Sequence, residues 1–368
     1  MALPEVICVR DVEKYAIAHL NKNALGYYDS GADDEETLND NINACKKLRL
    51  RPRMLVDVTK VDCSTTILGQ KISFPVGIAP SAMQRMAHPD GEIATVKAAD
   101  SLKTCMTLST LSTTSMESVA EASPNTLRWF QLYVVKDREI TRQFVKRAEK
   151  SGYKALVLTV DAPVLGNRRI DVRNRFHLPP HLSLGNFEKV TLHIEKNKKS
   201  DSELSRYFVS EMDASLTWKD ITWLKSITSL PVIVKGILTA EDAEMAVSVG
   251  VEGIWVSNHG GRQLDGVPTA IEALPEIVKA VNNRAEIYAD GGFRSGTDVF
   301  KAIALGARAV FVGRPILWGL VYNGQKGVEK VLQLLQQEFH RTMQLSGCVS
   351  IKDIKSSLIT YASSYSKL

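Results

Sequence analysis

The sequence has little of what marks a membrane, secreted or nucleic-acid-binding protein. Its 368 residues contain no run of 18 apolar residues, so we expect no transmembrane helix and no membrane partner. The first ten residues, MALPEVICVR, lack the basic region and the long apolar run of a secretory signal. Lys and Arg number 46 against 41 Asp and Glu, and this excess is spread along the chain without a long basic run. That distribution argues against a nucleic-acid partner.

Cysteine is scarce and forms no pattern. The chain has five cysteines, an odd number without a CxxC pair: Cys8, Cys45, Cys63, Cys105 and Cys348. Scattered cysteines of this kind are typical of reduced, structural thiols in an intracellular protein, and we expect no metal site. A composition that is 44% hydrophobic and 24% charged is ordinary for a globular protein with a sizeable core.

What the sequence does contain is a repeated alternation of short apolar runs and amphipathic segments from residue 74 onward. The apolar runs predict eight strands, at 74–80, 106–110, 127–133, 155–161, 231–237, 253–259, 286–292 and 309–314. Helical patterns such as GEIATVKAADSL and TAEDAEMAVSVG separate them. A (β/α)₈ TIM barrel has the same number of apolar strands, eight, each followed by a helix. The doubly wound alternative would need a GxGxxG turn after its first strand, where this chain has IAPSAMQ.

Two segments stand outside this repeat. Residues 1 to about 70 predict a helical extension before the barrel, which we place at 74–346. Residues 162–216 form an unusually long connection after the fourth strand, and we expect part of it to be a lid and part to be mobile. The sequence does not determine whether residues 177–215 are ordered. No break in composition divides the chain, so we expect one domain over residues 1–368. The last three residues, SKL at 366–368, are a peroxisomal address and predict an import receptor as partner.

Polar and charged residues follow the predicted strands at the rim where a TIM barrel carries its chemistry. After strands seven and eight, backbone N–H groups of Gly291, Gly292 and Gly313 can point at an anion that Arg294 and Arg314 clamp. These two loops are where such barrels usually bind phosphate. The sequence therefore predicts a phosphate-bearing ligand at this part of the rim.

The stretch WVSNHGGRQLDG, residues 255–266, ends the sixth strand with a histidine, two glycines and an arginine. His259 lies on the same rim as Asp161, and a histidine oriented by a carboxylate is how a general base is built. The planar guanidinium group of Arg262 can donate two parallel hydrogen bonds to a carboxylate. Lys235, at the end of strand five, has two interpretations: an ion pair with Asp161 or another rim carboxylate, or a cation beside an electron-rich cofactor ring. The remaining six histidines have no comparable setting and are expected to be structural.

Several of these motifs together resemble one family. They are SNHGGRQLDG at strand six, DGGFRSGTDVFKAIALGA at strand seven, VGRP at strand eight and TVDAPVLGNRRIDVRNRF at strand four. In this order they are similar to the FMN-dependent (S)-2-hydroxy-acid oxidases, in the branch of peroxisomal glycolate and long-chain hydroxy-acid oxidases. The resemblance runs from GYYDSGADDEET near residue 26 to the terminal SKL.

The resemblance implies FMN as cofactor and a role for each matching residue. His259 would be the base and Asp161 its orienting carboxylate, Arg262 and Arg168 with Tyr27 would bind the substrate carboxylate, and Tyr133 would hydrogen-bond the 2-hydroxyl. Lys235 would stabilise the reduced flavin. The other residues implied at the cofactor are Pro80, Ser81, Ala82, Ser109, Gln131, Thr159, Ser257, Asp290, Gly291, Gly292, Phe293, Arg294, Gly313 and Arg314.

One residue departs from the glycolate oxidases. Leu111, in LSTLSTTS, stands where the resemblance places a tryptophan. The smaller side chain favours medium-chain or long-chain 2-hydroxy acids, oxidised to 2-oxo acids with O₂ reduced to H₂O₂; glycolate as main substrate is the alternative. A dehydrogenase that passes electrons to a cytochrome or quinone, and a catalytically dead flavin-binding scaffold, are the rival interpretations. The resemblance also implies homotetramers, or octamers built from them.

Overall fold

The computed structural model describes residues 3–188 and 211–364 and contains a closed barrel of eight parallel strands. Around the barrel the strands follow the order β10-β11-β4-β5-β6-β7-β8-β9, so each strand pairs with its neighbour in the chain. They span Val76–Ile78 (β4), Cys105–Leu108 (β5), Leu127–Leu132 (β6), Leu156–Thr159 (β7), Val232–Ile237 (β8), Gly253–Val256 (β9), Glu286–Asp290 (β10) and Ala309–Val312 (β11). The predicted TIM barrel is confirmed.

Helices cover the outside of the barrel, and several begin at a Thr, Ser or Asp whose side chain accepts from the first turn. They span Gly91–Ser101 (α4), Met116–Ala122 (α5), Arg138–Lys150 (α6), Trp218–Ser226 (α9), Ala240–Ser248 (α10), Ala270–Val281 (α11), Gly296–Ala304 (α12) and Arg314–Leu345 (α13). Helix α13 is kinked at Asn323 and Gly324, where the backbone leaves helical geometry. No helix in the described ranges is long and apolar enough to span a membrane.

Most of the predicted strands are two or three residues too long at their C-terminal ends. The clearest case is β9, predicted to reach His259 but ending at Val256. His259, Gly260 and Gly261 all have positive φ (58°, 67° and 72°), so the chain turns sharply instead of continuing the ladder. The residues that end the strands are those that carry the polar side chains, and they leave the sheet to surround the rim.

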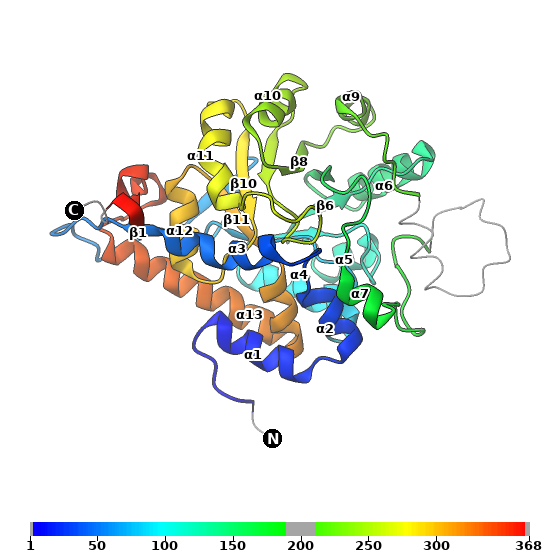
Figure 1. Ribbon diagram of the computed structural model, residues 1–368, viewed down its shortest axis with the longest axis horizontal. Coiled ribbons are helices and arrows are strands. Elements are labelled where there is room, and N and C mark those ends of the chain that lie inside the picture. Colours follow the sequence, from blue (N-terminus) through cyan, green and yellow to red (C-terminus); the bar gives the residue numbers. More distant parts are fainter. Residues whose placement is uncertain (1–2, 189–210, 365–368) are drawn as a thin grey trace.

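The N-terminal extension is only partly helical. It begins with α1 (Val9–His19), α2 (Lys22–Asp29) and α3 (Glu36–Ala44), and α1 and α2 pack beside α13 (Figure 1). The expectation of helices up to residue 70 is wrong for residues 48–72. There β1 (Leu48–Leu50) pairs with β12 (Ile359–Tyr361), while β2 (Thr65–Ile67) and β3 (Gln70–Ile72) form a hairpin. Leu68 and Gly69 at its tip have positive φ, as a two-residue hairpin turn requires.

The hairpin closes one end of the barrel. Ile67 and Ile72 are buried among side chains from inside the barrel. Four of these are large rings that contact one another: Trp129, Trp255, Tyr288 and Phe311. The interior is therefore a packed core.

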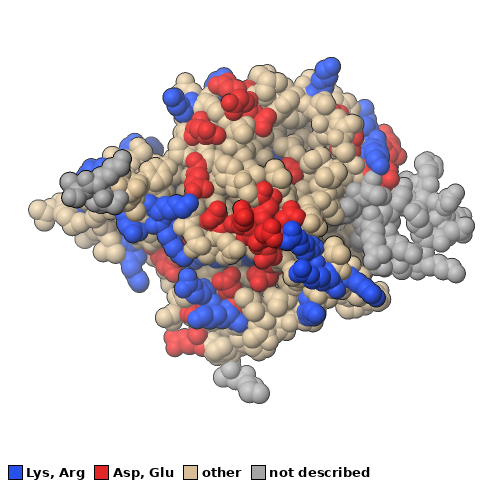
Figure 2. Space-filling view, viewed as in Figure 1, with Lys and Arg blue, Asp and Glu red and all other residues tan. Residues whose placement is uncertain are grey.

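The connection after β7 folds back over the N-terminal helices. Its helix α7 (Arg169–Asn174) lies beside α2 (Figure 1). Arg169 bonds Asp34 at 2.5 Å and lies 3.6 Å from Asp33, and Figure 2 shows basic side chains of this region next to acidic ones gathered above α3. Residues 189–210 of this connection, which is expected to be partly mobile, and the SKL terminus lie outside the described residues.

Candidate active site

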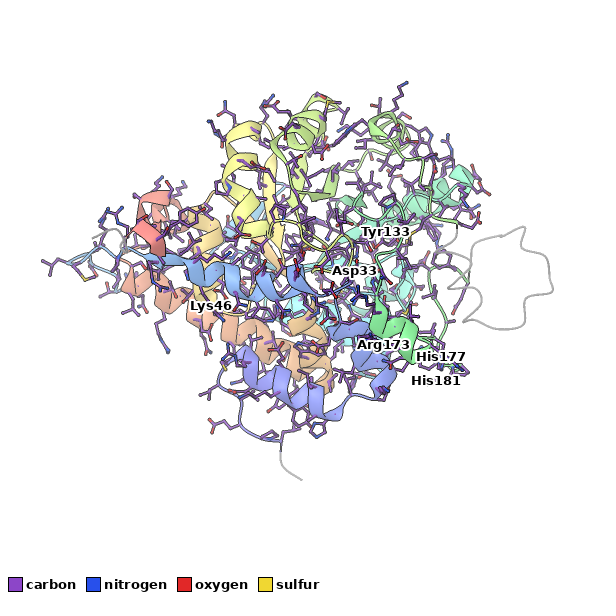
Figure 3. The ribbon with its side chains drawn as sticks, viewed as in Figure 1. Asp33, Lys46, Tyr133, Arg173, His177 and His181 are labelled. Carbon is purple, nitrogen blue, oxygen red and sulfur yellow. The ribbon has the colours of Figure 1, made fainter. Side chains whose placement is uncertain are left out.

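The C-terminal ends of the barrel strands surround a cavity that contains most of the residues singled out from the sequence. It is lined by Tyr27, Pro80, Ser81, Ala82, Ser109, Leu111, Gln131, Tyr133, Thr159, Arg168, Lys235, His259, Arg262, Asp290, Gly291, Gly292, Phe293, Arg294, Gly313 and Arg314. The two remaining predicted residues, Asp161 and Ser257, lie one layer back, in contact with His259 and Lys235. Figure 3 shows that His177 and His181 instead lie out beyond α7, away from Tyr133.

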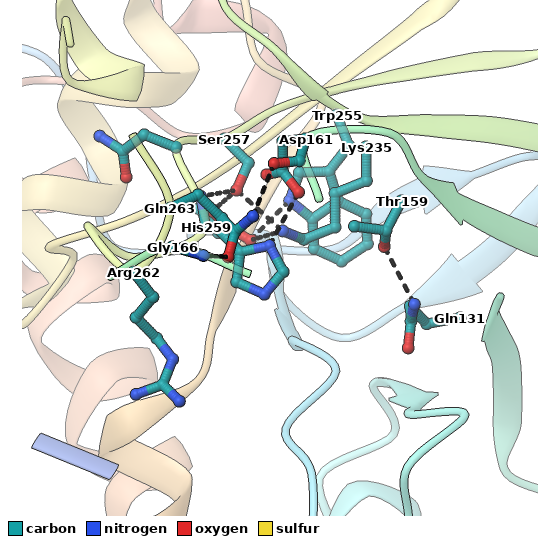
Figure 4. Close-up of polar contacts among 12 residues, drawn as sticks. Gln131, Thr159, Asp161, Gly166, Lys235, Trp255, Ser257, His259, Arg262 and Gln263 are labelled. Carbon is teal, nitrogen blue, oxygen red and sulfur yellow. Dashed lines mark hydrogen bonds and ion pairs between the residues drawn. The ribbon is translucent and has the colours of Figure 1, made fainter. Parts of the chain in front are cut away.

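His259 is fixed by two contacts at the end of β9. Its Nδ1 lies 2.8 Å from Asp161 Oδ1, and its backbone N–H donates to Ser257 Oγ at 3.0 Å (Figure 4). A left-handed backbone is uncommon for histidine and is found at functional sites that over-determine it. Burial lowers the pKa of His259, and the carboxylate of Asp161 offsets this only in part. The neutral imidazole therefore presents Nε2 to the cavity as a proton acceptor.

Asp161 stays ionised although it is buried. Burial by itself would raise the pKa of Asp161, but the charge and hydrogen bond of His259, with the charge of Lys235, outweigh burial and lower it. The carboxylate packs against Gly236, where a Cβ would lie 2.6 Å from Asp161 Cβ and 2.7 Å from its Cγ. Glycine at 236 is thus what leaves room for this carboxylate beside β8.

Lys235 is a buried cation with a carboxylate partner. Its Nζ lies 3.2 Å from Asp290 Oδ2 and donates to Ser257 Oγ at 2.8 Å, and the side chain is 5% exposed. Asp290 in turn accepts from Trp255 Nε1 at 3.0 Å and from Ser257 Oγ at 2.5 Å. Of the two partners the sequence left open, the ion pair is with Asp290, another rim carboxylate. Lys235 also lines the cavity, so the ion pair and a place beside a cofactor are compatible.

Arg262 and Arg168 form a pair of like charges at the mouth of the cavity. Arg262 Nη1 donates to the carbonyl oxygens of Tyr27 and Ser30, and its guanidinium lies over the Tyr27 ring, 4.8 Å from the centroid. Burial and then the charge of Arg168 lower the pKa of Arg262 to about 10. Because the charge of Arg168 disfavours that of Arg262, an anion such as a carboxylate bound at Arg262 would be stabilising.

A second cationic region lies at the loops after β10 and β11. Burial, followed by the charges of Arg262 and Arg294, lowers the pKa of Arg314 to about 9. Arg314 donates to the carbonyls of Tyr28, Gly260 and Ser30, which holds it at the start of α13. Arg294 Nε is buried and has no hydrogen-bond partner among the described residues.

The glycines of this region hold the backbone close to its neighbours. Gly291 and Gly292 have φ of 99° and 80°, and a Cβ at position 292 would overlap the carbonyl oxygen of Asn41. Gly313 is the N-cap of α13, and Gly313 and Arg314 line the same cavity. A glycine turn, a helix N-terminus and an arginine that has only a 3.8 Å ion pair with Glu13 and a long bond to the Phe293 carbonyl together suit the phosphate of a cofactor such as FMN.

A polar strip follows the ends of β5, β6 and β7 along one wall. Gln131 Nε2 donates to Thr159 Oγ1 at 3.1 Å (Figure 4), and Gln131 Oε1 accepts from the backbone N–H of Thr110 at 3.1 Å. Ser109 Oγ lies 3.4 Å from the same oxygen. Side chains already ordered in this way are suited to the polar edge of a planar heterocycle.

The apolar part of the lining includes two residues that the sequence did not single out. Leu111 is joined by Leu165 and Met212, from the two ends of the connection after β7. Leu111 is buried, whereas Leu165 is 46% exposed. Met212 lies beside β6 because it forms an isolated bridge with Val135. Nothing in the local pattern distinguishes these two from ordinary loop residues, since only the fold of the connection returns them to the rim.

The site as a whole has the features of a TIM-barrel enzyme: glycine-rich cationic loops suited to an anionic cofactor, two arginines suited to a small anionic substrate, and a histidine held by a carboxylate. No group of three or more candidate metal ligands occurs in the part of the chain that the structure describes. The sequence matches the FMN-dependent dehydrogenase family over residues 16–361, and the chain belongs to that family. It is a 2-hydroxy-acid oxidase with FMN as cofactor.

Individual relatives support this placement. The chain is 55% identical to 2-hydroxyacid oxidase 1 of Homo sapiens over 359 residues, covering 97% of each chain. It is 54% identical to glycolate oxidase of Spinacia oleracea over 355 residues, covering 96% of each. Among solved structures, mandelate oxidase superposes with a TM-score of 0.88 at 39% identity, covering 97% of this chain and 98% of the other.

Proposed function

We propose that this oxidase converts medium-chain or long-chain (S)-2-hydroxy acids to 2-oxo acids, with His259 as the base. The observation that carries the proposal is the meeting of the His259–Asp161 pair with Arg262 and Arg168 around one cavity. A substrate carboxylate held by the two arginines leaves the neighbouring carbon and its hydroxyl within reach of the histidine. FMN, when bound, takes up the two electrons of the substrate and passes them to O₂, giving H₂O₂.

Each residue of the chain has a separate part in this proposal. His259 takes a proton from the substrate, and Asp161 stabilises the imidazolium that forms. Tyr133 keeps its proton, because burial raises its pKa, so its hydroxyl can donate a hydrogen bond to the substrate. Tyr27 completes the carboxylate site through its contact with Arg262.

The residues proposed at the cofactor divide into three groups. Arg294, Arg314, Gly291, Gly292, Gly313 and the backbone of Phe293 would hold its phosphate and ribityl chain. Ser109, Gln131, Thr159 and the backbone of Pro80, Ser81 and Ala82 would surround the ring. Lys235, fixed by Ser257 and Asp290, would place its positive charge where the reduced ring becomes negative.

The chain-length preference rests on the apolar wall. Leu111, Leu165 and Met212 line the cavity with flexible aliphatic side chains rather than rings, which suits an alkyl tail. The alternative is a preference for glycolate, in which Leu165 or Met212 fills the space beside Leu111. The similarity to glycolate oxidases supports that alternative.

The experiment that tests the base is His259→Gln. We expect the variant to stay yellow with FMN and to lose about 10²–10⁴-fold in kcat, because an amide cannot accept the proton. For the wild-type enzyme, 2-hydroxyoctanoate should bleach the flavin under nitrogen and air should restore it. Turnover near that of the wild type in flavin-loaded His259→Gln would refute the role of His259.

Cellular location and assembly are further parts of the proposal. The SKL terminus, residues 366–368, supports peroxisomal import, and an oxidase that yields H₂O₂ fits that compartment. Microscopy of a fluorescent fusion with and without these three residues tests the address. A homotetramer, or an octamer built from tetramers, is proposed from the family resemblance, and light scattering of the purified enzyme measures it.

A further inference from the structure

We propose that Gln263 is a positioning residue that sets the place of Arg168 at the substrate carboxylate. The proposal rests on the proposed role of Arg168. Gln263 follows Arg262 directly, is 7% exposed, and makes no contact with the reacting part of the cavity. Its amide instead joins two loops: the turn after β9, which carries His259 and Arg262, and the first residues after β7, which carry Asp161 and Arg168.

The hydrogen bonds of Gln263 are directed at the connection after β7 from both ends of the amide. Nε2 donates to the carbonyl oxygens of Asp161 at 2.9 Å and Val164 at 2.8 Å. Oε1 accepts from the backbone N–H of Gly166 at 3.1 Å, close to the start of α7 (Figure 4). Both N–H groups of the amide are used, and the oxygen has an acceptor site left.

That remaining acceptor site faces Arg168. Arg168 Nη2 lies 3.4 Å from Gln263 Oε1, and Arg168 Nε donates to the carbonyl oxygen of Arg262 at 3.3 Å. Both contacts are long, so they orient the guanidinium group without using all of its hydrogen-bond donors. The other donors of Arg168 remain available for a carboxylate in the cavity.

Backbone packing shows how closely the two loops are joined. A Cβ on Gly166 would overlap the carbonyl oxygen of Arg262 and would lie 2.7 Å from Gln263 Cα. Only glycine allows this approach at position 166, and the Gln263 amide hydrogen-bonds Val164 before it and Arg168 after it. Loss of the amide would release residues 164–168, and a displacement of about 1 Å at a positioned group can cost 10²-fold in rate.

A double-mutant cycle separates positioning from a merely structural role. Gln263→Met, Arg168→Met and the double variant are prepared as FMN-loaded full-length enzymes, and KM and kcat for 2-hydroxyoctanoate are measured. We expect Gln263→Met to raise KM roughly tenfold with a much smaller change in kcat. In the Arg168→Met background we expect the same substitution to change KM less than about twofold, because the two residues act through one contact.

Gln344→Met is the matched control. Gln344 also donates from a half-buried amide to a backbone carbonyl, that of Val58 at 3.4 Å, but lies in α13 away from the cavity. KM should not change in this variant. If Gln263→Met does not retain FMN, Gln263→Asn takes its place in the cycle, since it stays polar but its side chain is one methylene too short for the contact with Arg168.

The outcomes are distinct. An equal increase in KM in both backgrounds, or no increase in either, overturns the positioning role of Gln263. A wild-type KM in Arg168→Met alone refutes the carboxylate-binding role of Arg168, which is a failure of the proposed function and is visible without any Gln263 variant.

Discussion

Asp161 contacts His259 through one oxygen only. Oδ1 lies 2.8 Å from Nδ1, whereas Oδ2 is buried and has no hydrogen-bond partner among the described residues. In the proposed mechanism this carboxylate orients the ring and balances the charge of the ring when the ring becomes protonated. This arrangement determines how the reaction depends on pH.

The acidic limb of the kcat/KM profile should fall below pH 6.5. A base acts only when it is unprotonated, and burial lowers the pKa of His259 from its usual value of 6.5, so the active form persists to lower pH. Asp161 raises that pKa, so Asp161→Asn should move the limb to still lower pH while reducing kcat. A limb that moves to higher pH in Asp161→Asn would contradict this assignment.

Removal of the substrate's charge should be nearly as damaging as removal of an arginine. Arg262→Met should lower kcat/KM by roughly 1.5–3 kcal/mol, tenfold or more, because a hydrogen bond to a charged group is lost. A 2-hydroxy amide should be a very poor substrate for the wild-type enzyme for the same reason. Comparison of acid and amide in both enzymes measures the effect, and equal turnover of the two by the wild type would show that the arginines have another role.

Leu111 should control the response to chain length. Each methylene buried along the aliphatic wall adds about 0.8 kcal/mol, near fourfold in kcat/KM, until the space is full. The series from glycolate through lactate to 2-hydroxyoctanoate should therefore rise, and Leu111→Trp should reverse it. A series that falls steadily from glycolate in the wild-type enzyme would favour the glycolate alternative.

Gly292→Ala should destabilise the protein more than Gly250→Ala. Both positions have positive φ, 80° and 75°, which costs an L-residue about 1–2 kcal/mol. A Cβ at 292 would also overlap the carbonyl of Asn41 in α3, adding about 1–3 kcal/mol, whereas nothing lies within 4 Å at 250. Urea unfolding measures the difference, and equal losses would mean that α3 moves away without cost.

The sequence predicted the barrel because its strands are mostly apolar and are separated by capped helices. It predicted the rim because polar residues in parallel strands collect at one end. It did not predict the β2–β3 hairpin, since three-residue strands are too short for periodicity, and Leu68 gives no sign of its left-handed backbone.

Contacts made across the fold were also beyond the sequence. The ion pair of Lys235 with Asp290 rather than Asp161 depends on the arrangement of β8 and β10 on either side of β9 in the closed barrel. Leu165 and Met212 reach the site only because the connection after β7 folds back, with Val164 against Gln263 in the turn after β9 and Met212 against Val135. Such contacts join residues far apart in the sequence, 55 positions for Lys235 and Asp290 and 99 for Val164 and Gln263, and leave no local pattern.

The hairpin that closes the far end of the barrel has a consequence for the order of events during turnover. With Ile67 and Ile72 packed at that end and four aromatic rings filling the interior, the described residues close the catalytic cavity on the side of the barrel interior, and reactants must reach it from the rim at the C-terminal ends of the strands. The hydroxy acid, the oxo acid, dioxygen and peroxide would all pass through this rim. A product that leaves slowly would then obstruct the entry of oxygen, and product release would limit the turnover rate.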